Sequence, residues 1–246
     1  MTKKGNIYSF EIWAKENRLV QGISSRFFGD LATGSERERL ENRHNFLNLL
    51  GLKAANLVTM EQIHSNKVKV VNSSHCGREI KDIDGMVTSD FCALAVKTAD
   101  CPSLIAFDGR QRVLAVAHAG WQGILGRIAG NLIKKMEDLG AVPKKIKVGI
   151  GPYVKACCYS IDQERAEKFL RSFGDLAGMI KKKECLFYLD LQVPIVFQLI
   201  ESGVLEKNIE AGKICTACRN DEFFSFRKEG FRSGRFFTVA AIRGKE

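Results

Sequence analysis

Histidine is scarce in this chain, which limits the metal chemistry that it can support. There are 4 His among 246 residues, and no His-x-His pair occurs. A site that holds several copper ions draws its ligands mostly from imidazole. The sequence therefore excludes a multicopper centre, although a site that holds a single copper ion remains possible.

Long apolar runs are also absent. No segment approaches the roughly 18 uninterrupted apolar residues of a membrane-spanning helix. The charged first residues, "MTKKGNIYSFEIW", are not followed by the apolar stretch of a signal peptide. We therefore expect a cytoplasmic protein with no membrane partner. In that reducing compartment the 8 Cys are expected to be buried, metal-binding or catalytic rather than disulfide-bonded.

Several motifs of known binding and catalytic sites are missing. The stretch "GIGPYV" is neither a phosphate-binding loop nor a dinucleotide fingerprint, and no Gly-x-Ser-x-Gly elbow occurs. The formal net charge is +10, but the basic residues are scattered and form no nucleic-acid-binding motif. We expect small anionic molecules rather than nucleic acid as partners. Most arginines are simply surface residues. The candidate anion contacts are four arginines near predicted turns: Arg26, Arg43, Arg227 and Arg235.

What the chain does contain is a mixture of short strands and amphipathic helices. Strands are predicted at 7–13, 19–28, 57–71 around a polar interruption, and 92–108 with a break at 98–102. Further strands are predicted at 112–121, at 145–154 running into a Gly-Pro turn, and at 223–243 with a turn in the middle. Helices are predicted at 34–52, 122–140, 162–174 and 193–204. Ser35 and Glu38 match a capping box, and Asp162 is a candidate N-cap. The apolar stripe of the first helix comprises Leu40, Phe46, Leu47 and Leu50.

The order of these elements indicates the fold class. Several strands follow one another directly, which favours an α+β fold with mixed sheets over regular alternation of strands and helices. No long linker rich in Pro, Gly or Ser interrupts the pattern. We therefore expect residues 1–246 to form a single domain.

Three predicted strands end at a side chain that can bind a soft metal. They are "EQIHSN" with His64, "KTADCPS" with Cys101 and "VAHAGW" with His118. If the three strand ends share a cleft, two imidazoles and a thiolate suit a catalytic zinc with an open position. Taken singly, each has an ordinary alternative, because a lone His is often a hydrogen-bonded structural residue and a lone Cys is often core.

The residues beside Cys101 add to this hypothesis. Pro102 restrains the backbone of Cys101 away from the helical region. Asp100 is a candidate to orient a histidine, or alternatively to cap the turn.

The remaining cysteines and histidines give weaker signals. Cys215 and Cys218 form a single Cys-x-x-Cys, which is incidental as often as it is half of a zinc or redox site. Cys157 and Cys158 precede a predicted helix, and one of them is expected to be buried. His75 and Cys76, in the polar stretch "NSSHCG", carry no strand context and are taken as incidental.

The motifs together resemble one known family. "EQIHSNKV", "DIDGMVTSD", "AVKTADCPSLIAFD", "VLAVAHAGWQG", "IGPYVKACCYSI" and "FFSFRKEGFRSGR" occur in order from about residue 22 to the C-terminus. The chain is similar to the polyphenol-oxidase or laccase-domain family, also called YfiH-like, whose members are described as purine nucleoside phosphorylases.

The resemblance implies a fold, a site and two reactions. The implied fold is a single α+β domain with mixed sheets and helices in a layered arrangement. The implied metal ligands are His64, Cys101 and His118. The implied reactions are phosphorolysis of adenosine, inosine and methylthioadenosine, and hydrolytic deamination of adenosine. Zinc is the first choice because neither reaction changes a redox state, while copper also suits a His₂Cys set.

Roles beyond the metal ligands are assigned as hypotheses. Cys101, Asp100 and Asp84 are the candidate catalytic residues, with the two aspartates handling protons. The candidate contacts to nucleoside and phosphate are Arg26, Arg43, Gln62 and Arg227.

The chain departs from the family pattern at two positions near these motifs. The family usually has Arg where Gln122 stands, and often an acidic residue where Ser160 stands. Loss of a fixed positive charge at Gln122 would weaken phosphate binding.

Three alternatives remain open. One is a metal-free hydrolase of amides or thioesters with Cys101 as nucleophile and His64 or His118 as base. The second is a single-copper oxidase of phenols. The third is a metal-binding or partner-binding protein without enzymatic activity.

Overall fold

The computed structural model describes residues 1–244, in which strands and helices form four layers. The first sheet has the order β1-β2-β3-β16-β8-β4-β6. Its strands are β1 (Thr2–Lys4), β2 (Ile7–Ser9), β3 (Leu19–Ser24), β4 (Leu57–Met60), β6 (Glu79–Ile80), β8 (Ala93–Thr98) and β16 (Phe236–Ile242). Within this sheet β4 runs parallel to β8 and β6, and the other neighbours are antiparallel.

The second sheet lies face to face with the first and has the order β15-β11-β9-β10-β7-β5. Its strands are β5 (Val68–Val70), β7 (Gly85–Thr88), β9 (Ser103–Asp108), β10 (Val113–His118), β11 (Lys147–Ile150) and β15 (Ile209–Ala211). Both faces of this sheet are covered, as β10 illustrates. Leu114 and Val116 face the first sheet, while Val113, Ala115 and Ala117 face the helices.

Helices cover the outer faces of both sheets. The helices are α1 (Glu36–Leu49), α2 (Trp121–Leu125), α3 (Ile128–Glu137), α4 (Gln163–Phe173), α5 (Gln192–Glu201) and α6 (Phe226–Glu229). Phe46 and Leu47 of α1 pack on the first sheet, and Leu132 of α3 and Leu199 of α5 pack on the second. The predicted α+β fold of mixed sheets in layers is confirmed.

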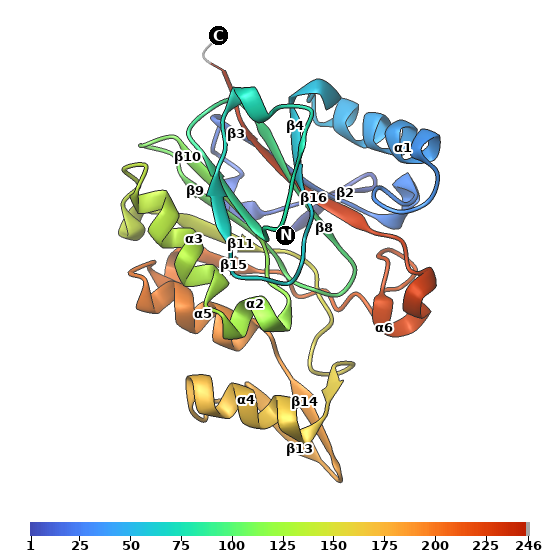
Figure 1. The fold of residues 1–246 in the computed structure, drawn as a ribbon, viewed down its shortest axis with the longest axis vertical. Coiled ribbons are helices and arrows are strands. Elements are labelled where there is room, and N and C mark those ends of the chain that lie inside the picture. The colour runs from blue at the N-terminus through green and yellow to red at the C-terminus, as the bar shows by residue number, and fades with distance from the viewer. Residues whose placement is uncertain (245–246) are drawn as a thin grey trace.

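A third, small sheet forms a lobe with α4 that projects from the layered body (Figure 1). Its strands are β12 (Ser160–Ile161), β13 (Ile180–Lys183) and β14 (Leu186–Leu189). The hairpin of β13 and β14 was not predicted, because its lysines and exposed positions lack a clear apolar alternation. No helix within residues 1–244 has the length and apolar character needed to cross a membrane.

The two predicted helix caps are confirmed. The Ser35 hydroxyl accepts a hydrogen bond from the Glu38 backbone N–H at 3.3 Å, and the Glu38 carboxylate accepts one from the Ser35 N–H. The Asp162 carboxylate accepts from the Arg165 N–H at 2.7 Å. One member of the predicted stripe on α1 is wrong, because Leu40 points to solvent and is 55% exposed.

Other predicted elements differ in extent or type. The strands at 7–13 and 19–28 end early, and each is followed by a 3₁₀ turn, Glu11–Trp13 and Arg26–Phe28. The helix at 122–140 breaks into α2 and α3 because Arg127 adopts a left-handed conformation with φ 68°.

The predicted strand at the start of 223–243 is wrong, because the segment contains the short helix α6 and a 3₁₀ turn. Its aromatic residues favour a strand, but one local and one long-range hydrogen bond to carboxylates stabilise the helical turn instead. The Glu229 carboxylate accepts from the Ser225 N–H at 3.1 Å, and the Asp100 carboxylate accepts from the Arg227 N–H at 2.6 Å.

Candidate active site and metal centre

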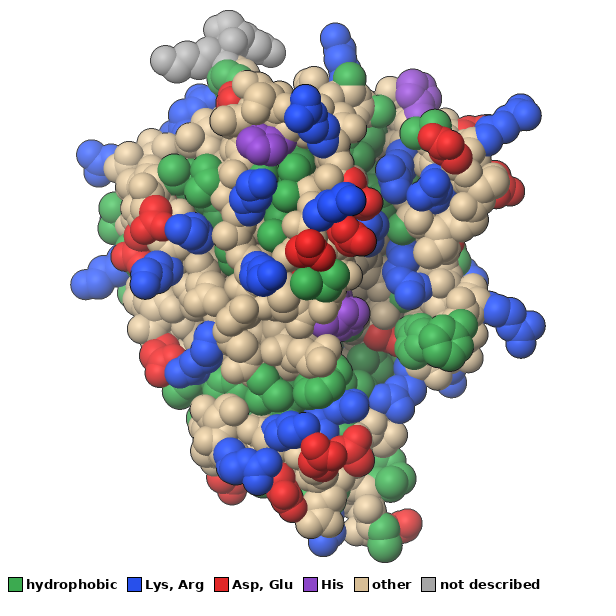
Figure 2. All heavy atoms as spheres, in the orientation of Figure 1, with side chains coloured by type: hydrophobic (Ala, Val, Ile, Leu, Met, Phe, Trp, Pro, Cys, Tyr) green, Lys and Arg blue, Asp and Glu red, His purple; other side chains and the backbone are tan. Residues whose placement is uncertain are grey.

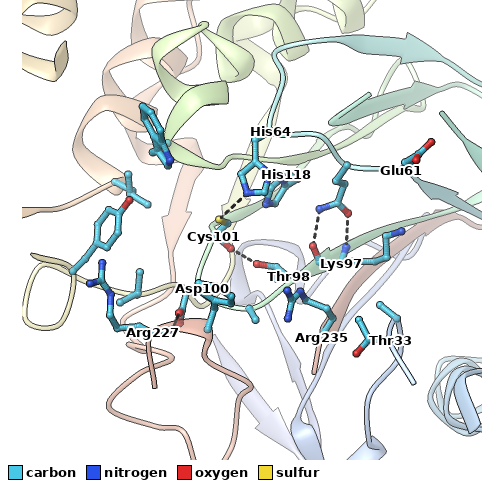
Figure 3. Close-up of a pocket in the computed structure, with 18 of the residues that line it drawn as sticks. Thr33, Glu61, His64, Lys97, Thr98, Asp100, Cys101, His118, Arg227 and Arg235 are labelled. Carbon is cyan, nitrogen blue, oxygen red and sulfur yellow. Dashed lines mark hydrogen bonds between the residues drawn. The ribbon is translucent and has the colours of Figure 1, made fainter. Parts of the chain in front are cut away.

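Three side chains from separate strand ends meet at one point of the fold. His64 follows β4, Cys101 lies between β8 and β9, and His118 ends β10. The three potential ligand atoms all lie within 4.8 Å of one another. The Cys101 Sγ is 4.0 Å from His64 Nε2, and the rings of His64 and His118 stand edge to face with centroids 4.7 Å apart (Figure 3).

The backbone at this point is bent in ways that L residues seldom adopt. His64 has φ 60°, and Asp100, which precedes Cys101, has φ 88°. Such conformations cost free energy and persist where the surrounding contacts enforce them, which is often at functional sites.

The buried carboxylate of Asp84 supports both histidines. It accepts hydrogen bonds from the backbone N–H groups of Ile63, His64 and Ser65 at 3.2, 3.1 and 2.7 Å, and from His118 Nδ1 at 2.8 Å. Burial alone would raise the pKa of Asp84, but the His118 and Ser65 donors outweigh burial and lower it. Asp84 therefore stays ionised and fixes the His118 ring so that its Nε2 is left for another partner.

Gly120 is required by the close approach of the two rings. A Cβ built on Gly120 would lie 2.6 Å from His64 Cδ2 and 3.3 Å from His118 Cε1. Any other residue would push the histidines out of their positions, since Cβ atoms essentially never come this close to other heavy atoms.

The electrostatics of the cluster favour a thiolate. Burial raises the pKa of the Cys101 thiol, but His118 and His64 outweigh burial and lower it to about 6. Burial lowers the pKa of His118, but attraction to Cys101 and Asp84 raises it to about 9. In the metal-free chain, Cys101 and His118 thus form an ion pair near neutral pH.

The cluster also fits a single soft divalent cation. In a tetrahedral zinc site the S and N ligands are about 3.6 Å apart, close to the 4.0 Å between Cys101 Sγ and His64 Nε2. A histidine that donates its second nitrogen to a carboxylate is the usual arrangement of a metal ligand, and His118 has it with Asp84. The predicted set of His64, Cys101 and His118 is therefore suited to one metal ion.

Asp100 ties the Cys101 loop to two other segments. Its Oδ1 accepts from the Thr216 hydroxyl at 2.5 Å, and its Oδ2 accepts from the Arg227 backbone N–H at 2.6 Å. Both carboxylates predicted to handle protons, Asp84 and Asp100, thus accept hydrogen bonds from protein donors, which gives each a positioning role in this structure.

The cluster opens into a cavity of about 810 Å³. Its apolar and aromatic lining includes Trp121, Val154, Tyr159, Leu191 and Phe226. Four cationic side chains also line it: Lys97, Arg165, Arg227 and Arg235. Figure 2 shows Lys and Arg side chains on both sides of the hollow between the layered body and the lobe of α4, β13 and β14. The cavity therefore suits a ligand that carries a flat ring and that is either anionic itself or binds together with phosphate.

The predicted substrate contacts divide into two groups. Arg227 lines the cavity, and so does Gln62, whose amide is bonded to the backbone of Lys97 at 2.7 and 2.8 Å. Arg26 and Arg43 do not line it. Arg26 pairs with Glu229 at 2.9 Å, and Arg43 donates to the Leu31 carbonyl at 2.7 Å.

Sequence reasoning missed two cationic residues of the cavity. Arg165 comes from α4, with its guanidinium 4.4 Å from the Trp121 ring, and Lys97 comes from β8. Nothing in the local pattern around either residue distinguishes it from a surface cation, so no sequence signal was available.

The two departures from the family pattern lie at the cavity or close to it. Gln122 is exposed on α2 next to Trp121, and it is not part of the lining. The Ser160 carbonyl accepts from the Arg227 guanidinium at 3.0 Å. A cationic lining is therefore present without an arginine at Gln122.

A family model described as multi-copper polyphenol oxidoreductase laccase matches residues 20–243. The chain belongs to this family. The other two histidines of this laccase-family chain, His44 and His75, are not in the cluster and contact Asn48 and Asn72. Within residues 1–244, the candidate metal groups therefore contain no more than two histidines.

Relatives in the laccase family carry names of nucleoside enzymes. Adenosine deaminase RL5, from an unknown prokaryotic organism, is 30% identical over 199 residues, which cover 77% of this chain and 76% of that protein. Purine nucleoside phosphorylase YlmD of Bacillus subtilis strain 168 is 27% identical over 238 residues, which cover 90% of this chain and 85% of that protein.

A solved structure has the same fold. The crystal structure of YlmD from Geobacillus stearothermophilus superposes with a TM-score of 0.91 at 22% identity, and covers 99% of this chain and 98% of that chain. At this identity the likeness concerns the fold.

Proposed function

We propose that this chain is a zinc-dependent purine nucleoside enzyme. The observation that carries the proposal is the meeting of His64, Cys101 and His118 at the floor of a cavity with aromatic and cationic walls. The proposed reactions are phosphorolysis of adenosine, inosine and methylthioadenosine, and hydrolytic deamination of adenosine. The names of the relatives support this choice of substrate class.

Zinc is the proposed ion because the donor set and the reactions agree with it. His64, Cys101 and His118 would hold the Zn²⁺, which would supply Lewis acidity to polarise an oxygen or to lower the pKa of water toward neutrality. The protein residues do the rest. Asp84 fixes the His118 ring, and Asp100 fixes the backbone that precedes Cys101.

The cavity walls suit the parts of a nucleoside and of phosphate. Trp121, Tyr159 and Phe226 offer faces on which a purine ring can stack. Arg165 and Arg227 offer donors for the oxygens of phosphate. In phosphorolysis a phosphate oxygen forms a bond to ribose C1′ while the bond from C1′ to the base breaks. The arginines hold the attacking anion for this displacement.

One alternative is favoured by a specific observation. The thiol of Cys101, with a pKa of about 6 beside His64 and His118, is suited to act as the nucleophile of a metal-free hydrolase. Zinc content discriminates between the two functions. One zinc per His64–Cys101–His118 site, with Cys101 protected from alkylation, contradicts the hydrolase, because a metal-ligated thiolate cannot serve as its free nucleophile.

The second alternative is a copper oxidase of phenols that uses the same three ligands. A His₂Cys site also suits copper, so the chain is loaded with Cu²⁺ and assayed with a phenol. Phenol oxidation without nucleoside turnover would favour the oxidase. Absence of turnover on any substrate would favour a protein that binds a metal or a partner.

The direct test is product analysis. Zinc-loaded protein is incubated with adenosine, with and without phosphate, and the products are separated by chromatography. We expect adenine and ribose 1-phosphate with phosphate and inosine without it, and loss of both in His118→Ala. The matched control is His75→Ala, which removes a histidine outside the cavity. If neither adenine, inosine nor hypoxanthine forms, the proposal is wrong.

A further inference from the structure

Four cysteines outside the cavity cluster in the same way as the three metal-site residues. The Cys157 and Cys158 sulfurs lie 3.6 and 3.4 Å from the Cys218 sulfur, and all four sulfurs, with that of Cys215, lie within 4.8 Å of one another. Cys157 and Cys158 belong to the turn between β11 and β12, while Cys215 and Cys218 follow β15. The cluster therefore joins segments that are about sixty residues apart in the chain.

The spacing of these sulfurs suits a tetrahedral metal ion. Four thiolates at 2.3 Å from Zn²⁺ stand about 3.8 Å from one another, and the distances to Cys218 Sγ are 3.4 and 3.6 Å. All eight cysteines, each within residues 1–244, are free thiols. A tetrahedral set of four sulfurs is typical of zinc or iron, and zinc needs no further inorganic component.

Backbone contacts hold the two segments of the cluster side by side. Tyr153 and Cys215 form a parallel bridge, and the Thr216 N–H donates to the Tyr153 carbonyl at 3.1 Å. The Lys155 N–H points at the Cys215 sulfur at 3.4 Å, which is the arrangement that stabilises a thiolate ligand. The two halves of the cluster are thus positioned by hydrogen bonds that do not involve Cys157 or Cys218.

We propose that Cys157, Cys158, Cys215 and Cys218 form a second, structural zinc site. All four positions around the ion are filled by protein, as in structural rather than catalytic zinc sites. Its function is to clamp the turn at 155–158 to the segment at 215–218.

The clamp lies directly behind the cavity. Tyr159, which follows Cys158, lines the cavity wall. Thr216, which follows Cys215, donates to the Asp100 carboxylate at 2.5 Å, beside the ligand Cys101. Loss of the structural ion would loosen the cavity wall without removing any ligand of the first site.

Metal content per chain gives the first test. The 246-residue chain is produced in zinc-supplemented cells, desalted and analysed by mass spectrometry for zinc. We expect two ions in the natural chain, one in His118→Ala, and one in the pair Cys157→Ser and Cys218→Ser. The matched control is Cys185→Ser, an exposed cysteine between β13 and β14, which should keep both ions.

Thiol protection in the natural chain gives a second test that needs no folded variant. The protein is alkylated with and without a chelator, and the modified cysteines are identified by peptide mass spectrometry. We expect Cys157 and Cys218 to be protected although both are exposed, and to become reactive once zinc is removed.

Two results would overturn the proposal. The first is a natural chain with one zinc that disappears in His118→Ala, together with unprotected Cys157 and Cys218. The second is protection that persists after chelation and ends only with a reductant, because a disulfide would then occupy the cluster.

Discussion

The Asp84 carboxylate lies 2.8 Å from His118 Nδ1 and also accepts the backbone N–H of His64 at 3.1 Å. One buried side chain therefore contacts both histidines of the proposed metal site. Because Asp84 occupies Nδ1 of His118, only Nε2 of that ring is available to a metal ion. The geometry of the site depends on this residue as much as on the ligands.

Replacing Asp84 with asparagine should weaken metal binding. Asp84→Asn removes the charge and places an NH₂ among backbone donors, so we expect zinc affinity to fall by about 10–100-fold. Competition with a chromophoric chelator measures the affinity. The control is Asp82→Asn, an exposed aspartate in the same turn with φ 57°, a conformation that asparagine accepts. Equal zinc affinity in Asp84→Asn and the natural chain would contradict the role.

Gly120→Ala should disrupt the site by steric conflict. The added methyl would lie 2.6 Å from His64 Cδ2, and displacement of the ring is expected to cost about 1–3 kcal/mol. We expect zinc affinity and Tm to fall together, measured by chelator competition and calorimetry. Gly244→Ala, whose Cβ would meet nothing within 4 Å, should change neither. Full zinc affinity in Gly120→Ala would show that the rings are not in contact with this glycine.

Arg227→Gln should separate phosphorolysis from deamination. Arg227 lines the cavity, and loss of a charge-assisted hydrogen bond to phosphate is expected to raise KM for phosphate by about tenfold. Deamination uses water instead of phosphate, so the rate of deamination should change much less. Initial rates with varied phosphate measure the effect, and Arg232→Gln, on the nearby turn outside the lining, is the control. A parallel loss of both activities would assign Arg227 to the nucleoside or to folding instead.

The pH dependence of Cys101 alkylation follows from its pKa. The thiolate is the reactive form, and the pKa of Cys101 in the metal-free chain is about 6. The rate of alkylation at Cys101, followed by peptide mass spectrometry after zinc removal, should therefore rise as pH increases through about 6. His118→Gln removes the cation that stabilises the thiolate, so the midpoint of Cys101 alkylation in this variant should shift to higher pH. A midpoint near 9 in the natural chain would contradict the electrostatic description, since 9.0 is the unperturbed value.

The sequence predicted the parts of the molecule that depend on local pattern. The capping box of Ser35 and Glu38 and the apolar strand that ends at His118 are local signals, and the structure has both. The meeting of His64, Cys101 and His118 depends on long-range pairing, and its prediction drew on the order of several motifs. The α+β assignment needed only the succession of strands and helices.

The errors arose where distant contacts decide. Residues 223–229 look strand-like, but the distant Asp100 carboxylate accepts a hydrogen bond from the Arg227 N–H and holds the backbone in α6. The Cys-x-x-Cys of Cys215 and Cys218 left open whether the pair is incidental or half of a zinc or redox site. The bridge that brings it to Cys157 and Cys158 joins segments about sixty residues apart, which local pattern does not show. Arg26 and Arg43 look like anion contacts in sequence, yet both are bonded to protein groups elsewhere.

The central claim is that one Zn²⁺ is held by His64, Cys101 and His118 in the cavity. Anomalous diffraction from crystals of the natural chain, recorded on both sides of the zinc absorption edge, tests it most directly. The account predicts an anomalous peak bonded to Cys101 Sγ and one nitrogen of each histidine, with Asp84 still on His118 Nδ1. Density without an anomalous peak between these residues, in crystals grown with zinc present, would contradict it.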